Sequence, residues 1–63
     1  MNIEEIVQKL RVSGGNYRII PTNDGYFKID VFKNSKWNTI AKNMSMTMCE
    51  DVINRAKNKV ILG

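Results

Sequence analysis

The apolar residues of this chain follow a helical period, then a strand period, and then a helical period again. This change constrains the fold more than any other feature, because each period belongs to one kind of element. The first apolar residues are spaced i, i+3, i+4 and i+7, as on one face of a helix: Ile3, Ile6, Val7 and Leu10. Asn2 can cap this helix with Glu5 in capping-box position, and residues 13–15, Ser-Gly-Gly, are expected to end it.

The segment after these glycines alternates with a period of two, which predicts strands. The first strand divides its side chains between two faces, with Tyr17 and Ile19 on one and Arg18 and Ile20 on the other. Pro21 ends it, since proline suits a strand end or an edge strand. Residues 22–25, Thr-Asn-Asp-Gly, predict a hairpin turn, because Asp-Gly tolerates the positive φ that such turns need.

The second strand is expected over residues 26–33, and it separates an apolar face from a mixed one. The apolar face consists of Phe27, Ile29 and Val31. The mixed face carries Tyr26, Lys28, Asp30 and Phe32. Residues 34–35, Asn-Ser, predict a second turn, and residues 37–41 make a third short strand that begins with Trp37.

A second amphipathic helix follows the third strand. Its apolar stripe consists of Cys49, Val52, Ile53, Ala56 and Val60. Thr47 has capping-box spacing to Glu50, and Ser45 is the alternative cap. The acidic residues near the expected start are Glu50 and Asp51, and the basic residues near the end are Arg55, Lys57 and Lys59. This order complements the helix dipole. The apolar tail, Val60-Ile61-Leu62-Gly63, either prolongs the helix, adds an edge strand or enters a partner.

These elements predict an α+β fold, a small α-β-β-β-α domain. The simplest arrangement is a three-stranded antiparallel meander with two helices packed on one face, so that the apolar face of the second strand meets both helix stripes. With 63 residues the chain is expected to form a single domain, residues 1–63. A domain of this size buries only about 60% of the surface of its unfolded chain, so self-association or partner binding would add buried area.

The sequence contains few residues that could act in catalysis. The chain has no His and 1 Cys, so neither a His-based triad nor a zinc site of about four N/S ligands can be assembled. Cys49 lies on an apolar stripe and is interpreted as a small buried hydrophobe. Asp30, an acid inside a strand, is interpreted as an ion-pair partner of Arg18 and Lys28. We therefore expect no enzyme, no cofactor and no metal site.

Charge and hydropathy indicate the compartment more than the ligand. There are 10 Lys and Arg against 6 Asp and Glu, a net charge of +4 that suits solubility and also permits an acidic protein or a nucleic acid as partner. No apolar run approaches the ~18 residues of a membrane span, and the start, Met1-Asn2-Ile3-Glu4-Glu5, is unlike the basic start of a signal peptide. We expect a cytoplasmic protein with a reduced thiol and no membrane contact.

Three groups of residues are candidate binding surfaces. The first is the outer sheet face, which is expected to present Arg18, Ile20, Tyr26, Lys28 and Phe32 together. Trp37 joins this face or the core, depending on the strand register. The second is the basic group around the second turn, Lys33, Lys36 and Lys42, and the third is the methionine group, Met44, Met46 and Met48. Solvated surface is the simpler explanation of the second group, and helix-entry packing that of the third.

The element order resembles that of two nucleic-acid-binding families. The order α-β-β-β-α resembles double-stranded-RNA-binding domains, and the span from Tyr17 to Ala56, with Trp37 in the last strand, resembles the DNA-binding arms of phage-type integrases. The first resemblance implies a lysine-rich start to the final helix, but Glu50 and Asp51 stand there. The second implies a sheet that reads DNA. Those arms belong to longer enzymes, and we assign the chain to neither family.

The leading functional hypothesis is a non-enzymatic protein-interaction module, an inhibitor or accessory factor of the kind that phages and mobile elements encode. It would act through the outer sheet face on a host or cognate protein and would self-associate as a homodimer. The alternative is nucleic-acid binding through the same face. In that case phosphates would bind Arg18, Lys28 and Lys33. Bases would stack on Tyr26, Phe32 or Trp37.

Overall fold

The computed structural model describes residues 2–58 as two helices and three strands. In chain order the elements are α1 (Ile3–Val12), β1 (Tyr17–Pro21), β2 (Phe27–Lys33), β3 (Lys36–Met44) and α2 (Met46–Lys57). The order α-β-β-β-α and the antiparallel three-stranded sheet confirm the predicted fold class. The predicted roles of Lys59, Val60 and the tail 60–63 lie outside the described residues.

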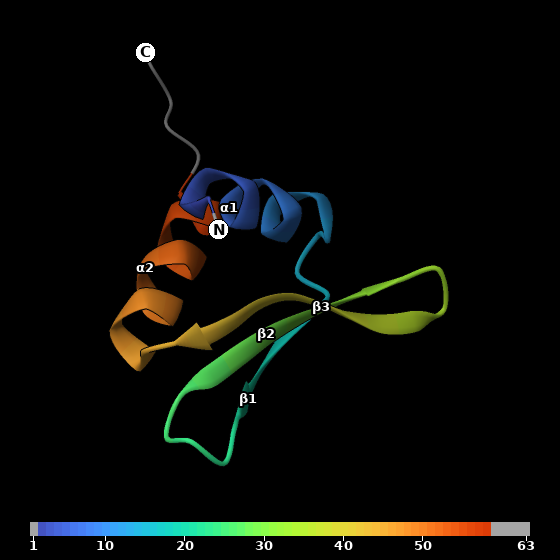
Figure 1. Ribbon diagram of the computed structural model, residues 1–63. Helices are drawn as coiled ribbons and strands as arrows, with labels where there is room; N and C mark the ends of the chain where they lie inside the picture. Colours follow the sequence, from blue (N-terminus) through green and yellow to red (C-terminus); the bar gives the residue numbers. More distant parts are fainter. Residues whose placement is uncertain (1, 59–63) are drawn as a thin grey trace.

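The sheet is a meander with β2 in the centre. β1 and β3 pair antiparallel with β2 on either side. Both helices lie on the same side of the sheet and pack against each other (Figure 1). The β2–β3 turn projects beyond them (Figure 1). We call the sheet face under the helices the closed face, and the opposite one the open face.

The core lies between the closed face and the two helices. Its buried apolar residues are Ile6, Val7 and Leu10 from α1, Ile29, Val31, Ala41 and Met44 from the sheet, and Cys49 and Val52 from α2. Phe27, which was predicted to share a face with Ile29 and Val31, packs at the margin of this core and is half-buried. The predicted apolar stripes of the helices therefore pack against the predicted apolar face of the strand, because each element buries the side that carries its large apolar residues.

Hydrogen bonds at the two ends of α1 explain its limits. The Asn2 side chain accepts a bond from the Glu4 N–H at 2.8 Å, as an N-cap does. At the other end the Ser13 N–H donates to the Lys9 carbonyl at 3.0 Å, and Gly14 follows with a φ of 65°. The cap and the glycine therefore begin and end the helix where the sequence predicts.

Ser45, rather than Thr47, caps α2. The Ser45 side chain accepts a hydrogen bond from a backbone N–H of the first helical turn at 3.1 Å. Glu50 and Asp51 therefore lie beyond the first turn of α2, which holds no acidic residue. The prediction that acidic residues at the helix start complement the helix dipole is wrong. Asp51 pairs instead with Arg55 along the helix, at 3.1 Å.

β3 extends beyond the predicted residues 37–41 at both ends. Its register against β2 shifts twice, so that Ile29 pairs with Ala41 while Phe27 pairs with Met44. These irregularities bring Ala41 and Met44 to the same closed face, although a regular strand would turn them to opposite faces. Simple alternation therefore stops being a guide to burial after Thr39, because Thr39 and Ala41 already lie on opposite faces.

Candidate functional site

The turn between β2 and β3 determines which face Trp37 takes. Asn34 and Ser35 both have positive φ, 56° and 63°, as the central residues of a type I′ turn require. A turn of this kind pairs the two flanking lysines and therefore pairs Phe32 with Trp37. Since residues paired directly across two strands share a face, Trp37 lies with Phe32 on the open face.

Arg18, Phe32 and Trp37 come together on the open face, and we call them the Trp37 cluster. The guanidinium carbon of Arg18 lies over the indole, 4.2 Å from its centroid. The Phe32 ring meets the same indole edge-to-face, with a centroid distance of 5.3 Å and an interplanar angle of 66°. Phe32 remains 43% exposed and Trp37 41% exposed. Each residue comes from a different strand, so only the folded sheet assembles the cluster.

A buried carboxylate lies beside this cluster. Asp30 is 2% exposed, although no helix of the described chain covers the open face (Figure 1). Its Oδ2 accepts a hydrogen bond from Arg18 Nε at 3.1 Å, which confirms the predicted ion pair for Arg18, whereas Lys28, the other predicted partner, forms no salt bridge with Asp30. Its Oδ1 accepts a hydrogen bond from the Thr39 hydroxyl at 2.7 Å. Asp30 is therefore held from both neighbouring strands.

Opposing effects act on the pKa of Asp30. Burial alone would raise the pKa of this carboxyl, but hydrogen bonds from Thr39 and Arg18 act in the opposite direction. With the nearby positive charges of Lys28 and Arg18, they hold the pKa below its ordinary value of 3.8. The carboxylate therefore stays ionised at neutral pH and fixes the Arg18 guanidinium in place.

The other predicted members of the open face lie farther along it. Ile20 and Lys28 are directly opposite each other on β1 and β2, and both are half-buried. Tyr26, 48% exposed, stands just before β2. It is at the opposite end of this strand from Phe32, roughly 20 Å away at about 3.3 Å per residue. The structure therefore brings the Trp37 cluster together and leaves Tyr26 apart.

The β1–β2 turn holds the backbone at Tyr26. The Asp24 carboxylate accepts hydrogen bonds from the Thr22 hydroxyl and, at 3.1 Å, from the Tyr26 N–H. These bonds, that from Thr22 above all, lower the pKa of Asp24. Gly25 has a φ of 85°, which glycine adopts without strain. The predicted turn at residues 22–25 is therefore present, and it positions Tyr26 independently of the Trp37 cluster.

The predicted basic group Lys33, Lys36 and Lys42 is divided in the structure. Lys33 and Lys36 pair across the β2–β3 turn, and the alternation of β2 places them on the closed-face side of the hairpin. Lys42 lies farther along β3, past a register shift. Lys33 therefore faces away from Arg18 and Lys28, with which it was grouped as a phosphate contact.

Thr39 was not among the residues that the sequence singled out. A signal for it exists, since counting outward from a two-residue turn at 34–35 places Thr39 opposite Asp30 and Trp37 opposite Phe32. Burial of Asp30 has no such local signal. It depends on side chains of both neighbouring strands closing over one position of β2.

Two further groups occupy structural positions. Cys49 is fully buried, and burial, with a smaller contribution from the Glu50 carboxylate, raises the pKa of its thiol. It therefore packs as a protonated core residue, as expected. Met44 is buried, whereas Met46 and Met48 are exposed at the start of α2. Helix-entry packing therefore explains only Met44.

No protein-family model, no curated protein and no solved structure matches this chain. Within residues 2–58, no helix combines the length and the apolar character needed to cross a membrane. In the same part of the chain, no three His, Cys, Asp or Glu side chains are grouped so as to hold a metal ion. The open face, with the Trp37 cluster, is therefore the main candidate site.

Proposed function

We propose that this chain is a small protein-binding module whose open face docks on a partner protein. The observation that carries the proposal is the Trp37 cluster, whose aromatic rings are exposed and yet tied to the sheet through Arg18 and Asp30. Tryptophan, tyrosine and arginine are the side chains that most often dominate the binding energy of protein interfaces, and aromatic residues in general are enriched there.

The cluster is ordered before a partner arrives. Asp30 holds Arg18, with Nε and Oδ2 at 3.1 Å, and Arg18 in turn covers one face of the Trp37 ring. Immobilising a flexible interface side chain costs about 0.5–1.5 kcal/mol, so an ordered cluster binds more tightly than a mobile one. The exposed parts of the rings are then available to apolar side chains of the partner.

Two contacts favour a protein over a nucleic acid as partner. Phosphate binding is strongest for an unpaired cation, but Arg18 is already paired with Asp30. Base stacking needs an open ring face, and the Arg18 guanidinium, 4.2 Å from the ring centroid, already covers one of the two faces of the Trp37 ring. Lys33 faces away, which leaves Lys28 among the predicted phosphate contacts of the open face.

The expected partner surface is apolar with an acidic side chain at its edge. The apolar part faces Phe32 and Trp37, and the acidic side chain faces Lys28, which is half-buried opposite Ile20. A net charge of +4 speeds the encounter with an acidic protein. A module of this kind suits an inhibitor or accessory factor that covers a surface of a host or cognate protein, as phage and mobile-element proteins do.

Capture of a partner from a cell lysate tests this proposal. The immobilised chain is compared with Phe32→Ser and with the matched control Tyr26→Ser, because Tyr26 is as exposed as Phe32 but lies at the far end of the face. We expect the wild type and Tyr26→Ser to capture the same protein from nuclease-treated lysate. The Kd measured with that protein should rise about tenfold or more with Phe32→Ser.

Two results would contradict the protein-binding proposal. One is loss of capture after nuclease treatment, and the other is equal affinity of Phe32→Ser in a variant that circular dichroism shows to be folded. A salt series adds an independent criterion. Binding to a nucleic acid weakens by roughly 0.7 to 0.9 of a log unit per phosphate contact for each log unit of salt.

A second copy of the chain is the competing occupant of the open face. A homodimer through this face would bury the Trp37 clusters of both copies against each other. Light scattering over a concentration series, on the wild type and on Phe32→Ser, separates the two cases. A wild-type dimer that becomes a monomer in the variant would assign the face to self-association, whereas a monomer in both leaves it to a different protein.

A further inference from the structure

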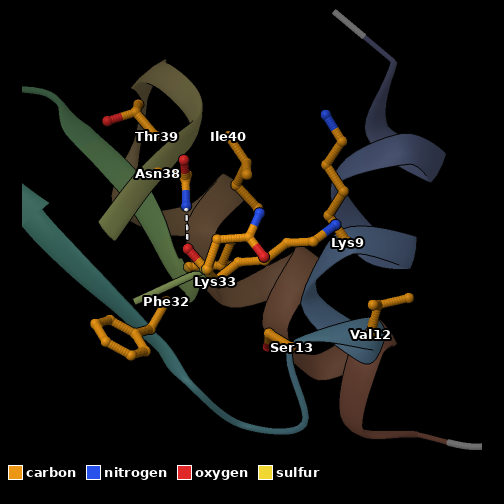
Figure 2. A pocket seen from close by; sticks show the side chains of 10 residues that line it. Lys9, Val12, Ser13, Phe32, Lys33, Asn38, Thr39 and Ile40 are labelled. Atoms are coloured by element: carbon orange, nitrogen blue, oxygen red, sulfur yellow. Dashed lines mark hydrogen bonds between the residues drawn. The ribbon is translucent and has the colours of Figure 1, made fainter. Parts of the chain in front are cut away.

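A hollow with a volume of about 510 Å³ lies between α1 and the β2–β3 hairpin (Figure 2). Its lining comes from the second half of α1 and from both strands of the hairpin. Phe32 contributes to the lining, but its ring points away, so the hollow adjoins the Trp37 cluster and does not contain the Phe32 ring (Figure 2). This volume is in the range of ligand-binding clefts.

The hollow combines apolar side chains with two cations. Val12 is 71% exposed, the most of any large apolar residue in the described part of the chain, and Ile40 adds a half-buried apolar side chain from β3. Lys9 reaches the hollow from α1 and Lys33 from the hairpin (Figure 2). The residues from 2–58 that line it include no acid.

The negative potential at the end of α1 is reduced at this place. A helix C-terminus carries partial negative charge on those carbonyls that lack partners. Here the Ser13 N–H donates to the Lys9 carbonyl at 3.0 Å, and the Ser13 hydroxyl donates to the Leu10 carbonyl at 2.6 Å. The Gly14 N–H donates to the Arg11 carbonyl at 3.1 Å. Three of the last four carbonyls of α1 therefore have partners, and Lys9 and Lys33 add two full positive charges beside them.

The surrounding chain adds positive charge. Residues 31–49 contain Lys33, Lys36 and Lys42 and no Asp or Glu. Glu5 lies one turn from Lys9 on α1 but does not line the hollow. Two cations beside exposed apolar side chains suit a ligand that brings both negative charge and an apolar group.

We propose that this hollow binds an acidic segment of a partner protein. An apolar side chain of the segment packs against Val12 and Ile40, and carboxylates beside it pair with Lys9 and Lys33. Charge complementarity selects the acidic segment. The apolar contact selects a peptide over a nucleic acid, because the aromatic ring of the lining, that of Phe32, points away and offers no platform for a base (Figure 2). This inference does not depend on docking at the open face.

An NMR titration with a synthetic peptide in which glutamates alternate with leucines tests the inference. We expect amide shifts of the isotope-labelled chain around Val12, Lys33 and Ile40, and unchanged amides around Ile20 and Tyr26, at the far end of the open face. Two control peptides carry glutamine in place of glutamate, or serine in place of leucine. Each should bind about fivefold more weakly or worse, because each removes one of the two kinds of contact.

Variants of exposed side chains locate the site without disturbing the core. Lys9→Gln combined with Lys33→Gln is expected to raise the Kd for the peptide about tenfold, and Val12→Ser about threefold. Lys42→Gln combined with Lys57→Gln is the matched control, since it also removes two positive charges from exposed residues, here outside the hollow. Its Kd should stay within about twofold of the wild-type value.

Three outcomes would overturn the inference. These are the absence of shifts at the hollow at about 1 mM peptide, shifts centred on the open face, and unchanged affinity of the double lysine variant. A single-stranded DNA of equal charge that binds the same amides more tightly than the peptide would also overturn it, and would assign the hollow to nucleic acid.

Discussion

The two faces of the sheet bury side chains in different ways, and β2 contributes to both. Ile29 and Asp30 are neighbours on this strand, are 0% and 2% exposed, and point to opposite faces. Ile29 packs in the core under the helices, whereas Asp30 is enclosed by Arg18 and Thr39 from its own sheet. A sheet can therefore bury a residue on its uncovered side, provided that the hydrogen bonds of the buried group are satisfied.

The two kinds of burial leave different surfaces behind. Apolar packing on the closed face is non-directional and removes large side chains from water. The hydrogen bonds of Asp30 are directional, so they place Arg18, and through it Trp37, while the aromatic rings stay exposed. The closed face therefore stabilises the fold, and the open face presents a cluster of defined geometry.

The same substitution on the two faces should have very different effects. Ile29→Ala opens a cavity in the core and is expected to lower the free energy of unfolding by about 2–5 kcal/mol. Ile20→Ala, on the open face and half-buried, is expected to lower it by about 1 kcal/mol or less. Urea denaturation followed by circular dichroism measures both. Equal losses would show that the open face is as much a core as the closed one.

Replacing the buried carboxylate should weaken the open face and remove a pH dependence. Asp30→Asn is expected to lower the free energy of unfolding by about 1–3 kcal/mol near neutral pH, because a charged hydrogen bond is lost. The pKa of Asp30 is held below its ordinary 3.8, so the ionised group contributes stability above that value. This contribution is lost as the pH falls through the folded-state pKa.

Denaturation of the wild type and of Asp30→Asn between about pH 7 and pH 2 checks this prediction, and the two stabilities should approach each other at the acid end. The pKa of Asp24 is lowered as well, but this group is present in both proteins and cancels in the difference. A gap of constant size at every pH would mean that Asp30 acts through its packing rather than its charge.

The smallest expected effect concerns the layer that covers the closed face. Ser45→Ala removes the cap of α2 and is expected to lower the free energy of unfolding by about 1 kcal/mol. Thr47→Ala is the matched control on an exposed residue of the first turn, with an expected change below about 0.5 kcal/mol. Thermal unfolding compares the two. A larger loss with Thr47→Ala would mean that the helix begins later in solution.

The sequence predicts some of the residue pairs between β2 and β3, and it does not predict the others. The two-residue turn at 34–35 implies the pairs Phe32–Trp37 and Asp30–Thr39, because such a turn leaves a single register. Past Thr39 this count fails, since the register shifts twice and no local pattern marks the shifts. The hollow between α1 and the hairpin has no sequence signal either, because it depends on how the helix docks.

The sequence by itself determined which elements form and, for every element except β3, which side is buried. The reason is local, since caps, glycines, turn residues and apolar period act within a few residues of one another. Only the tertiary structure decided that Asp30 is enclosed, that Arg18 lies on Trp37, and that Lys33 turns away from both. Those outcomes depend on side chains from several strands meeting at one place, and such contacts are set by register and docking over the whole domain.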